Sequence, residues 1–244
     1  MTLTLNWKEI EKVTLGINKY LKTSRFENIV VPKRNEFIEG YLKNEWAIRF
    51  QKNKKNYCLI FNIRKQNPYF YLIEGNGPKA STTAPRSTFD LGALKHLKGV
   101  LLDQIECVSN ERMVILWASN SFGIVLNLIP AQAEAVLIQK QDDQSYKVIA
   151  RTSKNEESTF VFPTKKASVY DAKVNEKLVN DLQHYSEVIT DYLQQEAFEK
   201  RKLAIEKKIS QQLTKTKKQL KKQLTTLKQA ENEPDWYLLG DVNG

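Results

Sequence analysis

The stretch from Pro85 to Leu116, PRSTFDLGALKHLKGVLLDQIECVSNERMVIL, carries the signals of a helix, a glycine stop and two paired strands. Ser87 or Thr88 suits the N-cap of the helix, and apolar residues follow at helical spacing. The helix is expected to end before Gly99, because glycine readily adopts the left-handed conformation that terminates helices. Its last turn carries the positive charges of Lys95, His96 and Lys98.

Two strands follow this helix and are joined by a tight turn. Val100 to Val108 and Met113 to Ala118 read as strands, and Ser109-Asn110 favours the turn between them. This hairpin places Glu111 and Arg112 at its tip, where we expect both side chains to be exposed. Taken alone, such a pair is most often a solvated ion pair of the surface, on which the stability of the fold depends little.

Short strands separated by turn residues surround this stretch. Asn6 suits the N-cap of a first helix, whose apolar residues recur at helical steps up to Leu21. Further strands are predicted at Arg25 to Val31, Trp46 to Phe50, Tyr57 to Ile63, Tyr69 to Ile73, Phe122 to Ile129, Ala135 to Ile138, Tyr146 to Ala150 and Thr159 to Phe162. So many short strands without intervening helices must pair antiparallel, in two sheets or one rolled sheet. Residues 1–165 are therefore predicted to form an α+β domain with few helices.

The composition changes after residue 165. Residues 166–196 carry apolar positions at helical spacing in a polar sequence, which predicts a helical connector. Over residues 197–231, apolar positions follow in steps of four, four and three, a period that indicates a coiled-coil helix that is nearly straight or winds weakly right-handed against its partner. One narrow apolar stripe implies one partner helix, and the sequence contains none. We expect either self-association through residues 197–230 or partial fraying of this helix.

The net charge of +10 is concentrated in two regions. Residues 1–170 hold 25 Lys and Arg against 16 Asp and Glu, and residues 200–228 hold eleven against Glu206 alone. A polyanion such as RNA is the simplest partner for both regions. In the first region we expect one exposed rim facing RNA, formed by Lys52, Lys54, Lys55, Arg64 and Lys65.

The remaining sequence features favour a binding protein. Cys58 and Cys107 lie far apart in apolar segments, which predicts reduced core cysteines, and the two histidines lack neighbouring ligands, so no metal site is expected. No phosphate-binding glycine loop or nucleophile motif occurs, so neither catalytic residues nor a cofactor are expected. The start, MTLTLNWKEIEK, is charged where a signal peptide is apolar, and no apolar run reaches a membrane span. We expect a cytoplasmic protein.

The stretch from Pro85 to Leu116, together with residues upstream of it, resembles the N-terminal domain of the NFACT family. This family includes the bacterial RqcH proteins of ribosome-associated quality control and fibronectin-binding protein A. The resemblance rests on the helix ending Lys95-His96-Leu97-Lys98-Gly99, followed by a strand, the pair Glu111-Arg112 and a second strand. Upstream, Tyr20-Leu21-Lys22 and the segment from Arg25 to Ile29 are similar to the family's opening helix and its "R-I-x-x-I" strand. Within residues 232–244, the segment from Asp235 to Asp241 resembles the family's "Y-x-x-x-G-E-L-L" segment, whereas Asn243-Gly244 departs from it. We expect a fragment that lacks the returning coiled-coil helix and the C-terminal RNA-binding domain.

The resemblance implies a fold like the N-terminal domain of formamidopyrimidine-DNA glycosylases. It also implies binding of tRNA and of large ribosomal subunits obstructed by peptidyl-tRNA, and, in the RqcH branch, support of C-terminal alanine tailing. Glu111, Arg112, Lys95, His96 and Lys98 would then join the basic rim in binding RNA. Two departures weigh against tailing: Glu111 replaces an aspartate, and the segment from Asn127 to Glu134 lacks the Glu, Gly, Arg and Asn of the family's "E-x-M-G-R-x-S-N" motif.

Two alternatives belong to other functional classes. The first is an adhesion protein of the fibronectin-binding type, which the apparent lack of an export signal disfavours. The second is a nucleic-acid enzyme related to the glycosylases. Those enzymes use an N-terminal proline as nucleophile, whereas this chain begins Met1-Thr2, which disfavours glycosylase chemistry.

Overall fold

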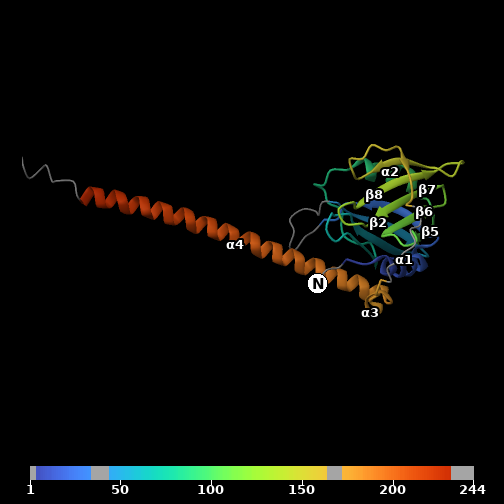
Figure 1. Cartoon of the computed structure of the whole chain (residues 1–244), viewed down its shortest axis with the longest axis horizontal. Coiled ribbons are helices and arrows are strands. Elements are labelled where there is room, and N and C mark those ends of the chain that lie inside the picture. The colour runs from blue at the N-terminus through green and yellow to red at the C-terminus, as the bar shows by residue number, and fades with distance from the viewer. Residues whose placement is uncertain (1–3, 34–43, 164–171, 232–244) are drawn as a thin grey trace, which may run out of the picture. The chain divides into compact units, whose positions relative to one another are not determined.

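The computed structural model describes residues 4–33, 44–163 and 172–231 (Figure 1). The chain divides into two compact units, Met1–Gln194 and Gln195–Gly244. Sheets and helices build the first unit, whereas the described part of the second is helical. The predicted segment of residues 232–244 lies outside the described ranges.

The elements follow in the order α1 (Trp7–Leu21), β1 (Arg25–Val30), β2 (Glu45–Lys52), β3 (Lys55–Asn62), β4 (Tyr69–Glu74), α2 (Thr88–Leu97), β5 (Leu102–Cys107), β6 (Met113–Ala118), β7 (Phe122–Asn127), β8 (Glu134–Lys140), β9 (Tyr146–Arg151), β10 (Thr159–Phe160), α3 (Glu176–Val179) and α4 (Leu182–Glu231). One sheet has the strand order β1-β2-β3-β4, and the other has the order β10-β9-β8-β7-β6-β5. The paired strands that the structure describes all run antiparallel. The predicted α+β fold class is confirmed.

The stretch from Pro85 to Leu116 forms the elements that its sequence predicts. Ser87 caps α2 and Asp90 completes the capping box, so two backbone N–H groups of the first turn are satisfied. Gly99 follows the helix with φ of 82°, a conformation that suits glycine. The β5–β6 hairpin then pairs Ile105 with Leu116.

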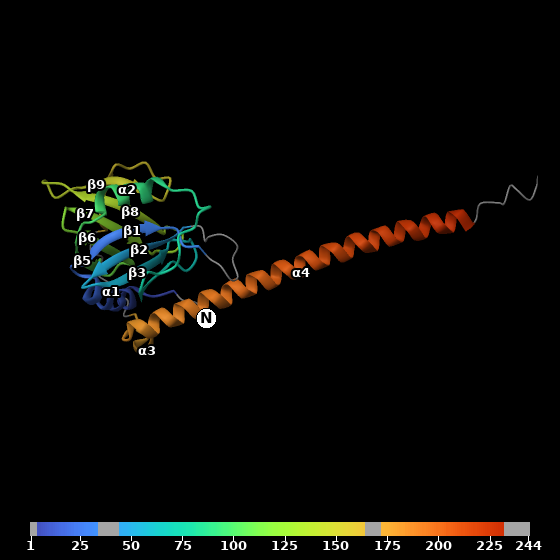
Figure 2. The same ribbon diagram turned by 180° about the vertical axis from the view of Figure 1, so that it is seen from behind.

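One main hydrophobic core lies between the two sheets and draws residues from both. On one side, α1 packs on β5 and β6 and buries Ile10, Val13 and Ile17. On another, α2 lies over β8 and β9 (Figure 2). Gly92 permits this close approach, because a Cβ atom there would meet Ala150 Cβ and Leu137 Cδ2, each at 3.2 Å.

Helices protect two sheet edges in the first unit. Along β4, the outer strand of its sheet, Tyr185 Oη donates to the Phe70 carbonyl at 2.9 Å and Ser186 Oγ donates to the Leu72 carbonyl at 2.7 Å. Along β5, the Ile105 N–H donates to Asn18 Oδ1 on α1 at 2.8 Å. Side chains of α4 and α1 thus form hydrogen bonds with backbone groups of β4 and β5 that could otherwise pair with a strand of another chain.

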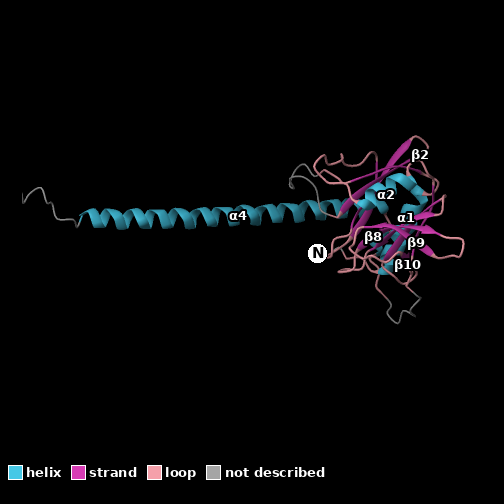
Figure 3. Ribbon diagram, turned by 90° about the horizontal axis from the view of Figure 1, so that it is seen from above, coloured by secondary structure: helices cyan, strands magenta, loops and turns pink. Residues whose placement is uncertain are grey.

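The long helix begins earlier than its sequence suggests. The sequence predicts it from Ala197, but α4, the long helix of Figure 3, starts at Leu182 after a break at Asn180-Asp181. Asp181 Oδ1 accepts the N–H groups of Gln183 and His184 at 2.9 and 3.1 Å, which is N-cap chemistry. In the second unit α4 exposes large apolar side chains, namely Phe198, Leu203, Ile205, Ile209, Leu213, Leu220, Leu224 and Leu227.

Candidate nucleic-acid interface

The β2–β3 hairpin presents three of the predicted lysines. Its turn is formed by Asn53 and Lys54, with φ of 50° and 64°. Strands β2 and β3 therefore extend into the polar residues between Phe50 and Tyr57, where the sequence predicts no strand. Lys54 and Lys55 are exposed at this turn. Lys52 instead reaches the C-terminal end of α1, where its Nζ donates to the Tyr20 and Lys22 carbonyls at 3.1 and 2.6 Å. Its positive charge lies at the negative end of the helix dipole, which is favourable.

The C-terminal end of α2 lies close to the start of β1. The Gly99 N–H donates to the Phe26 carbonyl at 2.8 Å, which places Lys98 and Arg25 near each other. His96 stacks on Phe122, with ring centroids 4.5 Å apart, and Asn120 Nδ2 donates to its carbonyl at 2.8 Å. Burial, assisted by the charge of Lys95, lowers the pKa of His96.

These contacts bring several elements together at one end of the domain, hereafter the basic end. Arg25 pairs with Gln51 of β2 and bridges to Leu101 before β5, so the end of α1, the start of β1, the β2–β3 turn and the end of α2 are neighbours. The basic end comprises Lys22, Arg25, Lys52, Lys54, Lys55, Lys95 and Lys98, with His96 among them. It is accompanied by the carboxylates of Glu27, Glu74 and Asp103, which leaves an excess of positive charge.

Arg64 and Lys65 lie elsewhere, so the expectation of a single rim is wrong. They follow β3, whereas the Lys52–Lys55 turn precedes it, and an eight-residue strand separates the two ends by about 25 Å. Arg64 lies over the Tyr69 ring at 5.3 Å, and its Nε donates to the Asn67 carbonyl at 3.0 Å. The local sequence could not show this separation, because it depends on the order of strands in the sheet.

Arg112 lies at the same end of the domain as Lys65. The Ala131 N–H donates to the Lys65 carbonyl at 2.9 Å, and the Leu128 N–H donates to the Arg112 carbonyl at 2.8 Å. The loop between β7 and β8 therefore links the β3–β4 loop to the β5–β6 hairpin. A second group of predicted residues, Glu111, Arg112, Arg64 and Lys65, is thus distinct from the basic end.

Arg112 is half-buried, which corrects the prediction of an exposed ion pair. Burial lowers its pKa, and the carboxylate of Glu9 opposes that shift. Glu9 is itself only 8% exposed, and accepts the N–H groups of Asn6 and Asn175, each at 2.9 Å. In the described part of the chain, Arg112 Nε has no hydrogen-bond partner and no ion pair joins Arg112 to Glu111.

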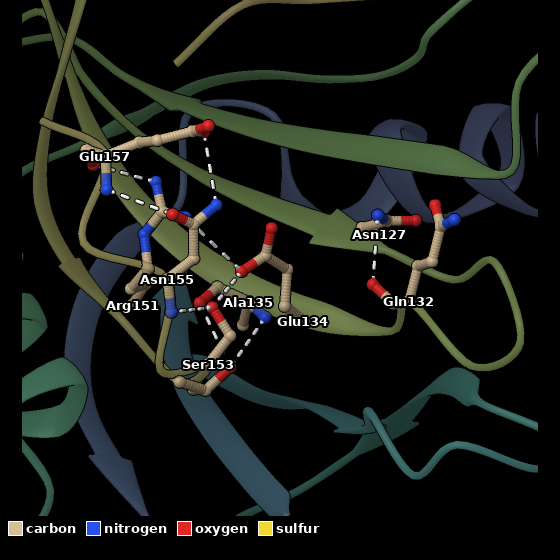
Figure 4. Close-up of polar contacts among 9 residues, drawn as sticks. Asn127, Gln132, Glu134, Ala135, Arg151, Ser153, Asn155 and Glu157 are labelled. Atoms are coloured by element: carbon tan, nitrogen blue, oxygen red, sulfur yellow. Dashed lines mark hydrogen bonds and ion pairs between the residues drawn. The ribbon is translucent and has the colours of Figure 1, made fainter. Parts of the chain in front are cut away.

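A polar cavity of about 600 Å³ beside β8, β9 and β10 was not predicted. Figure 4 shows the polar contacts of residues that line it, among them Glu134 and Arg151. The Arg151 side chain, 8% exposed, donates to the Glu157 carbonyl at 3.0 Å and lies 3.9 Å from Glu134 Oε2. Ser153 Oγ also donates to Glu134 Oε2, at 2.6 Å. Because Glu134 offsets the charge of Arg151, this cavity offers little attraction to a polyanion, and its contacts chiefly fix the loop after β9.

The segment from Asn127 to Glu134 uses its polar groups internally. Asn127 Nδ2 donates to the Gln132 carbonyl at 3.1 Å (Figure 4), and Asn127 Oδ1 accepts the Ile129 N–H at 3.0 Å. These contacts close the loop on itself. The segment that departs from the family motif therefore forms a loop whose polar groups bind one another.

Other kinds of site have little support. Burial raises the pKa values of the Cys58 and Cys107 thiols to about 12, which disfavours the reactive thiolate form. Among the described residues, no group of three His, Cys, Asp or Glu side chains is placed to hold a metal ion. The helices of the described part include none with the length and apolarity needed to cross a membrane.

Solved structures with a similar fold include the N-terminal domain of the fibronectin-binding protein PavA from Streptococcus pneumoniae, with a TM-score of 0.53 and 19% identity over 84% of this chain and 81% of that chain. The N-terminal structure of the fibronectin/fibrinogen-binding protein from Streptococcus suis gives 0.50 and 16% identity, over 66% of this chain and 61% of that one. Models of known protein families and curated protein sequences give no match. At these identities the likeness concerns the fold, and at that level it agrees with the expected family.

Proposed function

We propose that this protein is an RNA-binding factor that contacts tRNA and the large ribosomal subunit through its basic end. The observation that carries the proposal is the gathering of seven basic side chains from α1, β1, the β2–β3 hairpin and α2 at one end of the domain. Separate turns and helix ends converge there, so the positive charge is arranged along a surface rather than along one segment. Such an arrangement suits the regularly spaced phosphates of a nucleic acid.

The group around Arg112 would supply a second, separate contact. The two ends of β3 are about 25 Å apart, which is less than the roughly 34 Å of one turn of a nucleic-acid duplex. One duplex arm of a tRNA is therefore long enough to contact both groups. The basic end would supply most phosphate contacts, and Arg112 a single forked contact of its guanidinium.

The resemblance to RqcH proteins is the reason for proposing that this RNA is tRNA on an obstructed large subunit. Alanine tailing is not part of the proposal, because the chain lacks the motif that accompanies it and the segment from Asn127 to Glu134 is closed on itself. The protein would recognise and hold its RNA partners. It would supply no nucleophile.

Co-sedimentation with large ribosomal subunits over a salt series tests the proposal. A basic-end variant, Lys54→Gln/Lys95→Gln/Lys98→Gln, should lose binding at a lower salt concentration than the unaltered chain. A control variant with the same loss of charge, Lys79→Gln/Lys154→Gln/Lys177→Gln, should bind like the unaltered chain, because these lysines are exposed outside the basic end. Equal binding by all three proteins would contradict the proposal.

Fibronectin binding is the second candidate, favoured by the names of the structurally similar streptococcal proteins. The same three proteins can be tested on immobilised fibronectin in parallel. If RNA binding is the function, fibronectin should be retained weakly or not at all at physiological salt. Tight fibronectin binding that is unaffected by the basic-end variant, together with no retention on ribosomes, would favour adhesion instead.

A further inference from the structure

A groove of about 740 Å³ lies between the end of α1, strands β3 and β4, and the first turns of α4. All of its lining residues belong to the first unit. Its floor contains the rings of Tyr20 and Tyr57, whose centroids are 6.0 Å apart at an interplanar angle of 57°. Tyr20 is 47% exposed, so an aromatic face remains open to a ligand.

Carboxylates form the rim of this groove. Glu74 enters it from the end of β4, and Glu187 and Asp191 enter it from consecutive turns of α4. None of the described residues that line the groove is basic. Lys55, just outside, pairs with Glu74 at 3.0 Å, but both side chains are largely exposed and such a pair is readily exchanged.

The serine and threonine hydroxyl groups of the groove are already bonded to backbone carbonyls. Ser186 Oγ donates to the Leu72 carbonyl, and Thr190 Oγ1 donates to the Ser186 carbonyl at 2.8 Å. Gln183 Nε2 donates to Glu187 Oε1 at 3.0 Å, which orients that carboxylate. The groups that remain to recognise a ligand are therefore carboxylates and tyrosine rings.

We propose that this groove binds a basic peptide segment of a protein partner. An arginine or lysine side chain would lie over the Tyr20 ring and pair with Glu187 and Asp191, combining a cation–π contact with charge-assisted hydrogen bonds. Charge complementarity is the reason for this choice, because tyrosine faces and carboxylates both attract cations. The volume and apolar floor suit several side chains of a peptide better than a bare metal ion.

The positive charge of the rest of the chain favours this groove over other surfaces as the binding place of a basic peptide. With a net charge of +10, the protein repels a basic peptide over most of its surface, so we expect such a peptide to bind at the acidic groove. The inference goes beyond the proposed RNA binding and does not rest on it. Loss of one activity would leave the other in place, because Glu187 and Asp191 are not part of the basic end.

Fluorescence anisotropy with a labelled hexa-arginine peptide tests the groove. The variant Glu187→Gln/Asp191→Asn should bind about tenfold more weakly than the unaltered chain, since two exposed ion pairs are lost. Tyr20→Ala should weaken binding about three- to tenfold through loss of the cation–π contact. The control Asp142→Asn/Glu156→Gln makes the same change in charge at exposed sites outside the groove, and should leave the affinity unchanged.

Circular dichroism of each variant distinguishes loss of binding from loss of folding, and tRNA affinity measured on the same samples should not fall. The proposal is overturned if hexa-arginine does not bind the unaltered chain, or if the groove and control variants bind it alike. It is also overturned if free spermine competes as effectively as hexa-arginine, because the groove would then serve a small polyamine rather than a peptide.

Discussion

The guanidinium of Arg112 and the imidazole of His96 show how burial changes the role of a charged side chain. The charge of Arg112 is partly offset by the buried carboxylate of Glu9, and its Nε has no hydrogen-bond partner among the described residues. His96 is held against Phe122 at the end of α2. Both residues could be singled out from the sequence, but their burial depends on residues distant in the chain, such as Glu9 and Phe122, which no local pattern identifies.

Two substitutions of Arg112 distinguish the contribution of its packing to stability from that of its charge. Arg112→Met keeps a long apolar stem and should change the free energy of unfolding by less than about 1 kcal/mol, because the buried guanidinium is poorly compensated. Arg112→Ala also loses the packing of the stem and should lower that free energy by about 1–2 kcal/mol. If Arg112 contacts tRNA, both variants should weaken tRNA binding by about 1–3 kcal/mol. Urea unfolding and tRNA anisotropy measure the two effects, and unchanged tRNA affinity of Arg112→Met would remove this residue from the interface.

The pKa of His96 predicts a pH dependence of stability. Its folded pKa lies below the ordinary value of 6.5, so the unfolded state binds protons more readily over that range. The free energy of unfolding should therefore fall as the pH is lowered from about 7.5 to about 5.5. In His96→Phe, which keeps an aromatic ring on Phe122, this part of the decrease should disappear. Urea unfolding at several pH values provides the measurement, and identical pH profiles for the two proteins would contradict it.

At the scale of elements, the predictable parts are those with local signals. Asn6 with Glu9 and Ser87 with Asp90 form capping boxes, and Gly99 stops α2, so both helices could be located from the sequence. The sequence does not show where α4 starts, because its first turns are predicted as a separate connector. Only the structure shows that Tyr185, in those turns, contacts β4. The single basic rim was wrong for a similar reason, since the sequence does not show at which end of a sheet each turn lies.

The hydrogen bond from Tyr185 to the edge strand β4 should contribute to the stability of the fold. Tyr185 is fully buried, and its hydroxyl donates to the Phe70 carbonyl, so Tyr185→Phe leaves that carbonyl without this donor. We expect the free energy of unfolding to fall by about 1–1.5 kcal/mol. Tyr192→Phe is the matched control, because no described residue forms a hydrogen bond with its hydroxyl. Equal urea midpoints for the two variants would argue against a stabilising role of this edge contact.

At the scale of the whole molecule, the net charge indicated a polyanionic partner, but the distribution of that charge required the fold. The basic end gathers residues from α1, β1, β2, β3 and α2 or directly beside them, whereas residues 200–228 place eleven basic residues along one helix. The second region could be located from the sequence, because it is continuous. The first could not, since its members are separated by up to 76 positions along the chain, from Lys22 to Lys98.

Exposed apolar residues on the second unit predict salt-dependent self-association. Leu213, Leu220 and Leu224 lie on one stripe, but the surrounding lysines repel a second copy at low ionic strength. Raising the salt concentration from about 50 to about 500 mM should strengthen dimerisation by screening this repulsion. Sedimentation equilibrium should detect the change, and Leu213→Gln/Leu220→Gln should abolish it. A monomer at every salt and protein concentration would show that this helix does not pair with itself.

The salt dependence of tRNA affinity tests the central claim most directly. In a plot of log binding constant against log salt concentration, the basic-end variant Lys54→Gln/Lys95→Gln/Lys98→Gln should have a slope smaller in magnitude by about two to three units, because each lysine that contacts a phosphate contributes about one. The control Lys79→Gln/Lys154→Gln/Lys177→Gln should keep the slope of the unaltered chain. If the two variants have the same slope, the basic end is not the RNA-binding surface.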